Sequence, residues 1–211
     1  MASMLVVLDV DSTLIEQEAI ELLADEAGSG AQVAAITARA MAGELDFASS
    51  LADRVATLAG LDVAVFARVA PRITLTRGAR ELVDGVQAAG GCVAVVSGGF
   101  HELLDPLAVD LGLDAHRANR LELETGRLTG RTTGPVIDAA AKAAALREWA
   151  GSFGVPRSRT VVVGDGANDL ALMSEAGLSI AFDAKPVVRQ HAHVSLPERD
   201  LSAVLAVLGL R

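Results

Sequence analysis

Two apolar runs of this sequence are each followed by a pair of aspartates, at a spacing that could gather carboxylates in one place. Asp9 and Asp11 come after the run LVVL, and Asp165 and Asp169 follow the run TVVVG. Residues two apart in an extended segment face the same side, so the carboxylates of Asp9 and Asp11 should share one site. Without a counterion they would repel each other and one would take up a proton. A hard cation that prefers oxygen ligands removes this conflict, so the sequence predicts a Mg²⁺ site formed by Asp9, Asp11, Asp165 and Asp169.

A hydroxyl group and two glycines follow a third apolar run. Ser97 comes after CVAVV and precedes Gly98 and Gly99. If the substrate is a phosphate ester, Ser97 can donate a hydrogen bond to a phosphoryl oxygen, and the glycines let backbone N–H groups come close to it. Lys142, one of only two lysines, can neutralise developing phosphoryl charge. Taken singly, these are ordinary turn, cap or surface residues, but three strand ends in register weaken that interpretation.

The apolar runs also predict the elements that position these residues. Short β-branched runs that end in Asp, Ser or Gly are typical of strands buried on both faces. The predicted strands cover residues 5–8, 92–96, 160–163 and 178–182, and the predicted helices cover residues 79–89, 101–111, 139–150 and 168–176. Strands that alternate with helices form βαβ units. The sequence therefore predicts an α/β fold with a mainly parallel, Rossmann-like sheet sandwiched by helices, whose strand ends meet at one ligand-binding edge.

Residues 16 to about 70 interrupt the alternation of strands and helices. Apolar residues recur there at helical spacing, most clearly from Phe47 to Leu58, and glycines divide the segment. We expect three or four short helices that form a small helical-bundle cap, inserted after the first strand. The predicted domains are a core of residues 1–14 and 75–211 and a cap of residues 15–74. The Thr, Gly and Arg residues between Leu121 and Val136 predict a hairpin or an excursion at the sheet edge.

The composition limits the classes of protein. The 211 residues are 51% apolar and 21% charged, with 27 acidic and 18 basic residues and a formal net charge of −9. This charge argues against nucleic acid and membranes as partners, because both need a basic face. The single cysteine, Cys92, cannot form an intramolecular disulfide, and its apolar neighbours predict a buried, inert thiol. The first apolar run is too short for a signal peptide or a membrane span, so we expect a soluble, cytoplasmic protein.

Four short motifs of the chain together resemble those of the haloacid dehalogenase superfamily of phosphotransferases. They occur in the same order, as DVDST at Asp9, SGG at Ser97, Lys142, and GDGAND up to Asp169. The resemblance implies that Asp9 is a nucleophile that becomes an aspartyl phosphate. It implies that Asp11 protonates the leaving hydroxyl and then deprotonates the hydrolytic water.

The same resemblance implies the remaining site residues of the core. Mg²⁺ would be held by Asp9, the backbone carbonyl of Asp11 and Asp165, with support from Asp169. The phosphoryl group would be bound by Ser97, Gly98 and Lys142, and Asn168 would lie beside the substrate.

Residues of the predicted cap resemble those of the superfamily members that hydrolyse O-phospho-L-serine. In that branch, Glu18 would pair with the substrate ammonium group and Arg54 would hold its carboxylate. Met41 and Phe47 would close the pocket. The resemblance implies a Mg²⁺-dependent hydrolase of a small-molecule phosphate ester. A monomer and a homodimer are both compatible with the sequence. It assigns no role to Lys185, which we expect at the surface.

Other functions are compatible with parts of this pattern. The substrate could be another small amine phosphate, such as phosphohomoserine, phosphothreonine or phosphoethanolamine, although one without a carboxylate would leave Arg54 unpaired. A signalling module of the receiver type also holds a phosphoryl group on an aspartate, but it explains neither Asp11 nor an insert of roughly 55 residues. A noncatalytic metal-binding or scaffold protein leaves the reactive residues unexplained.

Overall fold

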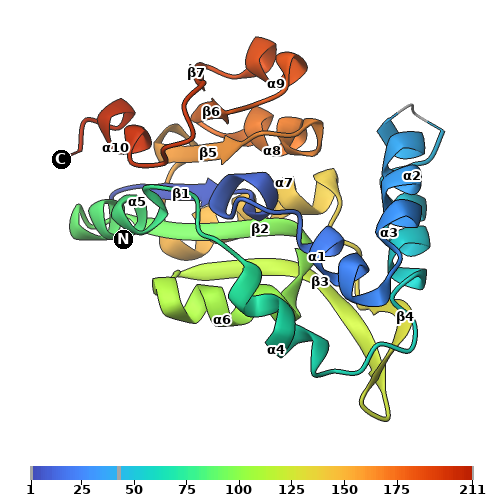
Figure 1. Ribbon diagram of the computed structural model, residues 1–211. Helices are drawn as coiled ribbons and strands as arrows, with labels where there is room; N and C mark the ends of the chain where they lie inside the picture. Colours follow the sequence, from blue (N-terminus) through green and yellow to red (C-terminus); the bar gives the residue numbers. More distant parts are fainter. Residues whose placement is uncertain (1, 42–43, 211) are drawn as a thin grey trace.

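The fold is built on one twisted sheet, seen in a computed structural model that describes residues 2–41 and 44–210 (Figure 1). Within these residues, seven strands form the sheet in the order β4-β3-β2-β1-β5-β6-β7. All neighbouring strands run parallel except β3 and β4, which form an antiparallel hairpin. The strands are β1 (Leu5–Leu8), β2 (Cys92–Phe100), β3 (Ala115–Glu124), β4 (Arg127–Thr133), β5 (Thr160–Gly164), β6 (Leu178–Phe182) and β7 (Val194–Leu196). The predicted α/β fold is confirmed.

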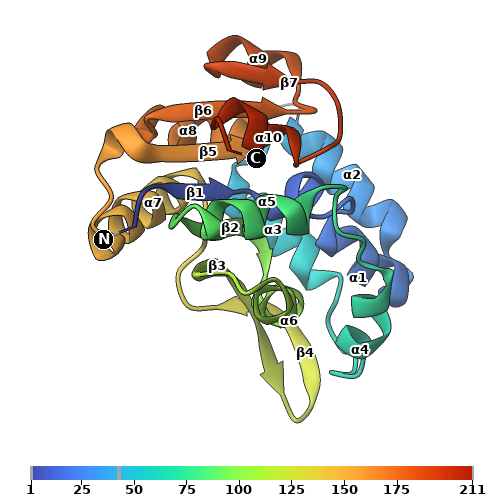
Figure 2. The ribbon, with the colours of Figure 1, turned by 90° about the vertical axis from the view of Figure 1, so that its left-hand side faces the viewer.

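Helices cover both faces of the sheet, because the side chains of its strands point alternately to the two faces. Val6 and Leu8 of β1 belong to one apolar core, whereas Leu5 and Val7 belong to the other. The first core is closed by α5 (Ala79–Ala88), α6 (His101–Leu111) and α10 (Ala203–Val207). The second is closed by α7 (Ala139–Phe153), α8 (Leu170–Glu175) and α9 (Pro186–His191). Figure 2 shows the sheet nearly edge-on, with α5 and α7 on opposite sides of β1.

The segment between β1 and α5 is helical, as its apolar spacing predicts. It contains α1 (Ala19–Ala27), α2 (Gly30–Met41), α3 (Phe47–Ala56) and α4 (Val65–Val69). Its two connections to the sheet run side by side, because the Glu16 N–H donates to the Thr74 carbonyl at 2.9 Å and Ile15 bridges Leu75. This crossing lies at the predicted boundaries of the cap, and we propose residues 15–74 as the cap domain.

The apolar core of the cap is shared with the β3–β4 hairpin. Leu51 and Val55 of α3 belong to the same buried cluster as Leu121 and Leu128 of the hairpin. The Gly60 N–H donates to the Leu128 carbonyl at 2.8 Å, and the Leu128 N–H donates to the Leu61 carbonyl at 2.9 Å. The sequence predicts either a hairpin or an edge excursion here, and the structure shows a hairpin on which the cap rests.

Three local predictions need correction. The second strand does not end at Val96: it continues to Phe100 through the Ser-Gly-Gly segment, with a register shift against β3. The helix predicted over 168–176 divides into a short 3₁₀ turn, Ala167–Asp169, and α8. Cys92 is half-buried, not buried, because it begins its strand. Among the helices of the described ranges, none is both long and apolar enough to cross a membrane.

Candidate active site

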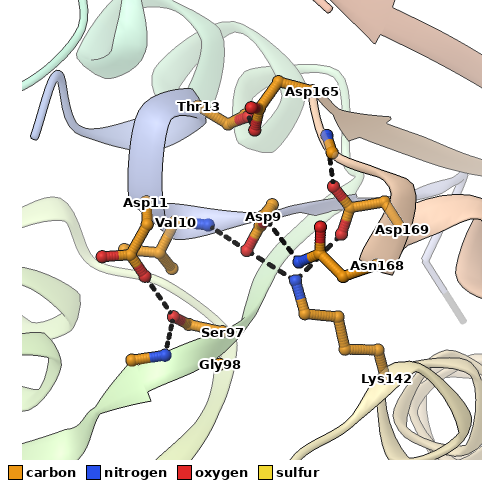
Figure 3. A network of polar contacts seen from close by, with 12 residues as sticks. Asp9, Val10, Asp11, Thr13, Ser97, Gly98, Lys142, Asp165, Asn168 and Asp169 are labelled. Atoms are coloured by element: carbon orange, nitrogen blue, oxygen red, sulfur yellow. Dashed lines mark hydrogen bonds and ion pairs between the residues drawn. The ribbon is translucent and has the colours of Figure 1, made fainter. Parts of the chain in front are cut away.

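A pocket of about 700 Å³ lies between the sheet and the cap. The ends of β1, β2 and β5 provide its floor, and α1, α2 and α3 of the cap cover it. Figure 3 shows Asp9 in the middle of the polar side chains at these strand ends, joined by dashed lines to Val10, Lys142 and Asn168, while Asp11 pairs with Ser97. Because the carboxyl ends of parallel strands form the ligand-binding edge of such sheets, the pocket lies where the fold favours a binding site.

Asp9 is at the centre of the polar network. It is buried, and its Oδ1 accepts a hydrogen bond from the Val10 N–H at 2.7 Å. The same oxygen lies 2.7 Å from the Lys142 ammonium. Asp9, Asp165 and Asp169 each place one carboxylate oxygen within 4.8 Å of the others. The structure therefore brings Asp9 together with Asp165 and Asp169, as the sequence predicts.

Lys142 is a buried ion-pair partner rather than a surface lysine. It lies on α7, is 1% exposed, and contacts Oδ1 of Asp169 at 2.9 Å as well as Asp9. Burial alone would lower its pKa, but the charges and hydrogen bonds of Asp169 and Asp9 outweigh burial and raise the pKa above its usual value. The ammonium group therefore stays charged beside Asp9, where it can stabilise charge on a bound phosphoryl group.

Replacing Lys142 with methionine should destabilise the protein and impair any reaction at Asp9. Removing one partner of a buried ion pair leaves uncompensated carboxylates, so we expect the free energy of unfolding to fall by about 3–5 kcal/mol. We expect kcat to fall about 10²–10³-fold. Urea unfolding without added divalent cation measures the first effect. Lys185→Met, at an exposed lysine, should change stability by less than about 0.5 kcal/mol, and equal losses in both variants would contradict the ion-pair interpretation.

The carboxylate cluster has an excess of negative charge. Burial, followed by the charge of Asp9, raises the pKa of Asp169 to about 7, although Lys142 opposes the shift. Burial and the charge of Asp9 also raise the pKa of Asp165. The Thr13 hydroxyl donates to Oδ1 of Asp165 at 3.0 Å and fixes this carboxylate. Three oxygen donors with one neighbouring lysine fit a hard divalent cation, which would supply the missing positive charge.

Asp11 corrects one expectation, because its carboxylate is not among the clustered oxygens. The chain leaves the extended conformation after Asp9 and enters a tight turn over Val10–Leu14. The Asp11 carboxylate instead accepts from the Ala19 N–H and from the Ser97 hydroxyl, both at 2.7 Å. Burial and the charge of Asp9 raise its pKa, which favours a protonated carboxyl group. Its predicted metal contact through the backbone carbonyl stays a prediction.

The two glycines of the Ser-Gly-Gly segment lie in close contact with neighbouring side chains. A Cβ on Gly99 would lie 2.8 Å from Oδ2 of Asp11, and a Cβ on Gly98 would lie 2.9 Å from Cζ of Phe47. The Gly99 N–H donates to the Ser97 hydroxyl oxygen at 2.6 Å. A larger residue at Gly98 would displace the Phe47 ring of the cap, and one at Gly99 would displace the Asp11 carboxylate.

Sequence reasoning missed Asn119, a buried residue of β3. Its amide group donates to the Gly98 carbonyl and its oxygen accepts from the Ile137 N–H, both at 2.8 Å. It thereby ties the Ser-Gly-Gly segment to the chain that leads into α7 and Lys142. Asn119 lies outside the predicted strands and helices, and a single asparagine there gives no signal of this role. The contact between Thr13 and Asp165 was also not predicted, although Thr13 belongs to the DVDST motif.

The predicted cap residues lie around the same pocket. Glu18, Phe47 and Arg54 line it, as do Asn168 of the core and the exposed Lys185. Burial, followed by the charge of Asp11, raises the pKa of Glu18 to about 7. Burial lowers the pKa of Arg54, whose Nε–H donates to the Ser50 carbonyl at 3.2 Å. The Asn168 amide lies 3.5 Å from Oδ2 of Asp9. The side chain of Met41 lies outside the described part.

A second group of possible metal ligands within the described residues lies apart from the pocket. His101 Nδ1 and His116 Nε2 contact the same oxygen of Asp105 at 2.6 and 2.9 Å. The Ala118 N–H donates to Nε2 of His101 at 3.2 Å, so this nitrogen accepts and Nδ1 carries the proton. Because Nδ1 of His101 carries a proton that faces Asp105, it has no lone pair with which to bind a metal ion there. This group is therefore a carboxylate that bridges two imidazoles.

Together, the parallel sheet, the acidic cluster at its carboxyl edge and the helical insert over it define a capped α/β protein with a candidate metal-binding active site. Comparison with known proteins gives the family: the haloacid dehalogenase-like hydrolase model matches residues 6–174, and the chain belongs to this family.

Similar proteins come from several organisms. The chain is 49% identical over 204 residues to a phosphoserine phosphatase of Streptococcus thermophilus, covering 97% of this chain and 95% of that protein. It is 53% identical over 209 residues to one from Streptomyces coelicolor, covering 99% of this chain but only 51% of that relative, so it spans about half of its length. A solved phosphoserine phosphatase with bound substrate superposes with a TM-score of 0.92 at 40% identity, over 98% of this chain and 99% of that chain.

Proposed function

We propose that this protein hydrolyses O-phospho-L-serine to L-serine and phosphate, through an aspartyl phosphate and with Mg²⁺. The observation that carries the proposal is the charge pattern of the pocket. A carboxylate, Glu18, and a guanidinium, Arg54, line it together with Asp9. These charges match the ammonium and carboxylate groups of phosphoserine, which flank its phosphate ester. The curated relatives described above carry the name of this activity and support the same substrate.

The reaction starts at Asp9. Its Oδ1 is held by Lys142 and the Val10 N–H, which leaves Oδ2 to attack phosphorus in line with the leaving serine oxygen. The new bond joins Oδ2 to phosphorus, the bond from phosphorus to the serine oxygen breaks, and Asp11 gives its proton to that oxygen. Burial and the charge of Asp9 raise the pKa of Asp11, which favours the protonated carboxyl group and supports this role.

The second half of the reaction releases phosphate. The ionised Asp11 takes a proton from a water molecule, whose oxygen attacks phosphorus and displaces the Asp9 carboxylate. Lys142, beside Asp9, would bind the phosphoryl oxygens. The Ser97 hydroxyl donates its proton to Asp11 in the structure, so it would bind a phosphoryl oxygen after turning away from Asp11. Mg²⁺ held by Asp9, Asp165 and Asp169 would offset the negative charge of the phosphoryl group.

Replacing Arg54 with alanine tests the substrate. The variant loses the partner of the substrate carboxylate, so we expect the KM for phosphoserine to rise about 10–100-fold. The KM for p-nitrophenyl phosphate, which has no carboxylate, should change far less. Phosphate release with both substrates measures this difference.

The matched control is Arg39→Ala, at an exposed arginine of α2 that pairs with Glu44. Equal losses with both substrates in Arg54→Ala would refute the role of Arg54. A panel of phosphoserine, phosphothreonine, phosphohomoserine and phosphoethanolamine, with and without Mg²⁺, decides among the amine phosphates. The oligomeric state and the location in the cell stay predictions.

A further inference from the structure

We propose that Ser12 is a positioning residue that holds the Glu18 carboxylate at the ammonium-binding side of the pocket and thereby sets selectivity for substrates with an amino group. The inference rests on the proposed function and deepens it. Ser12 would not contact the substrate itself. It would hold Glu18 in the orientation that binds the substrate ammonium group.

The contact that carries the inference is a short hydrogen bond. The Ser12 hydroxyl donates to Oε1 of Glu18 at 2.7 Å. Glu18 occupies the N-cap position of α1, yet its side chain makes no capping bond. The first N–H of the helix, at Ala19, donates to Asp11 instead. The carboxylate of Glu18 therefore does not cap α1. Its orientation beside the pocket is set by the hydrogen bond from Ser12.

The backbone of Ser12 adopts a strained conformation. Its φ of 58° lies in the left-handed region, where glycine is favoured and a residue with a Cβ is strained. Glycine would relieve this strain and would keep the Ser12 N–H bond to the Gln17 carbonyl, which measures 3.3 Å. A strained serine whose hydroxyl bonds a pocket carboxylate is the pattern expected of a residue retained for function.

The charges of the pocket explain why Glu18 needs a fixed position. Asp11 and Asp9 repel its carboxylate, whereas Arg54 attracts it across the same pocket. Without Ser12, Glu18 could pair with Arg54, and both substrate-binding charges would be neutralised. In the structure the two side chains have separate partners, since Glu18 bonds Ser12 and Arg54 bonds the Ser50 carbonyl.

The experiment separates selectivity from stability. We expect Ser12→Gly to raise the KM for phosphoserine about 10-fold, the effect of one hydrogen bond to a charged group, with kcat changed less than about 3-fold. The KM for p-nitrophenyl phosphate should change far less. The Tm should stay the same or rise by about 1–3 °C, because the strain is relieved. A merely structural role predicts the opposite, a lower Tm and equal losses with both substrates.

Two further variants make the test specific. Thr125→Gly, at an exposed residue with a φ of 48° in the β3–β4 turn, relieves similar strain away from the pocket and should leave both KM values unchanged. If Ser12 acts through Glu18, the variant that combines Ser12→Gly with Glu18→Gln should have the KM of Glu18→Gln alone.

The outcomes distinguish this inference from the proposed function. An unchanged KM for phosphoserine in Ser12→Gly, or fully additive effects in the double variant, would overturn the role of Ser12 while phosphoserine hydrolysis stands. If the unsubstituted protein releases no phosphate from phosphoserine, the proposed function fails and this inference fails with it.

Discussion

Asp9→Asn should reduce phosphate release from phosphoserine by at least about 10⁴-fold. The amide has the size of the carboxylate and its oxygen can still accept from the Val10 N–H, so the local backbone keeps its hydrogen bond. It cannot form an aspartyl phosphate, because an amide oxygen is a poor nucleophile at phosphorus. Steady-state phosphate release at saturating substrate measures the loss.

The control for this prediction is Asp84→Asn, at an exposed aspartate of α5 that should retain full activity. Circular dichroism shows whether both variants are folded. If folded Asp9→Asn retains more than about 1% of the activity, Asp9 is not the nucleophile and the proposed chemistry at this site is wrong.

Removing divalent cations is the second large effect that we expect. Dialysis against EDTA should reduce activity by at least about 10³-fold, and added Mg²⁺ should restore it. The reason is the excess of carboxylates around Asp9, whose charge also raises the pKa of Asp165 and Asp169. Full activity after EDTA treatment would contradict a metal-dependent reaction.

Calorimetry of Mg²⁺ binding gives a readout that does not depend on turnover. Asp165→Asn should weaken Mg²⁺ binding at least about 10-fold, because it removes one charged oxygen ligand. The matched control is His116→Ala, in the second group of possible ligands, which should leave Mg²⁺ binding unchanged. Equal weakening in both variants would place the metal elsewhere.

Much of the fold could be predicted because local patterns and tertiary environment agree. The first strand, Leu5–Leu8, and the helix His101–Leu111 have the predicted bounds, since one is apolar throughout and the other keeps helical spacing up to its C-cap, Gly112. The end of β2 could not be predicted. Ser-Gly-Gly is a turn signal, and only the neighbouring β3 strand, held through Asn119, keeps this segment extended.

In the candidate site, too, some features could be predicted from the sequence and others could not. The ends of strands predict that Asp9, Asp165 and Asp169 meet, because parallel topology fixes which ends are neighbours. The orientation of Asp11 depends on a turn and on Ala19 and Ser97, which are distant partners that spacing alone does not reveal. The burial of Lys142 was also hidden, because an alanine-rich helix gives little indication of which face packs inward.

The shared core of the cap and the β3–β4 hairpin anchors one edge of the cap to the sheet. Backbone bonds join the chain after α3 to β4, so we expect this edge of the cap to move only together with the hairpin. Thr37 and Ala40 of α2, the loop after β5 and Lys185 line the same pocket. Figure 1 shows α2 beside α3, with β4 below them. If the cap opens, we therefore expect the pocket to widen on the α2 side, beside Lys185, where a dianionic substrate would meet that cation.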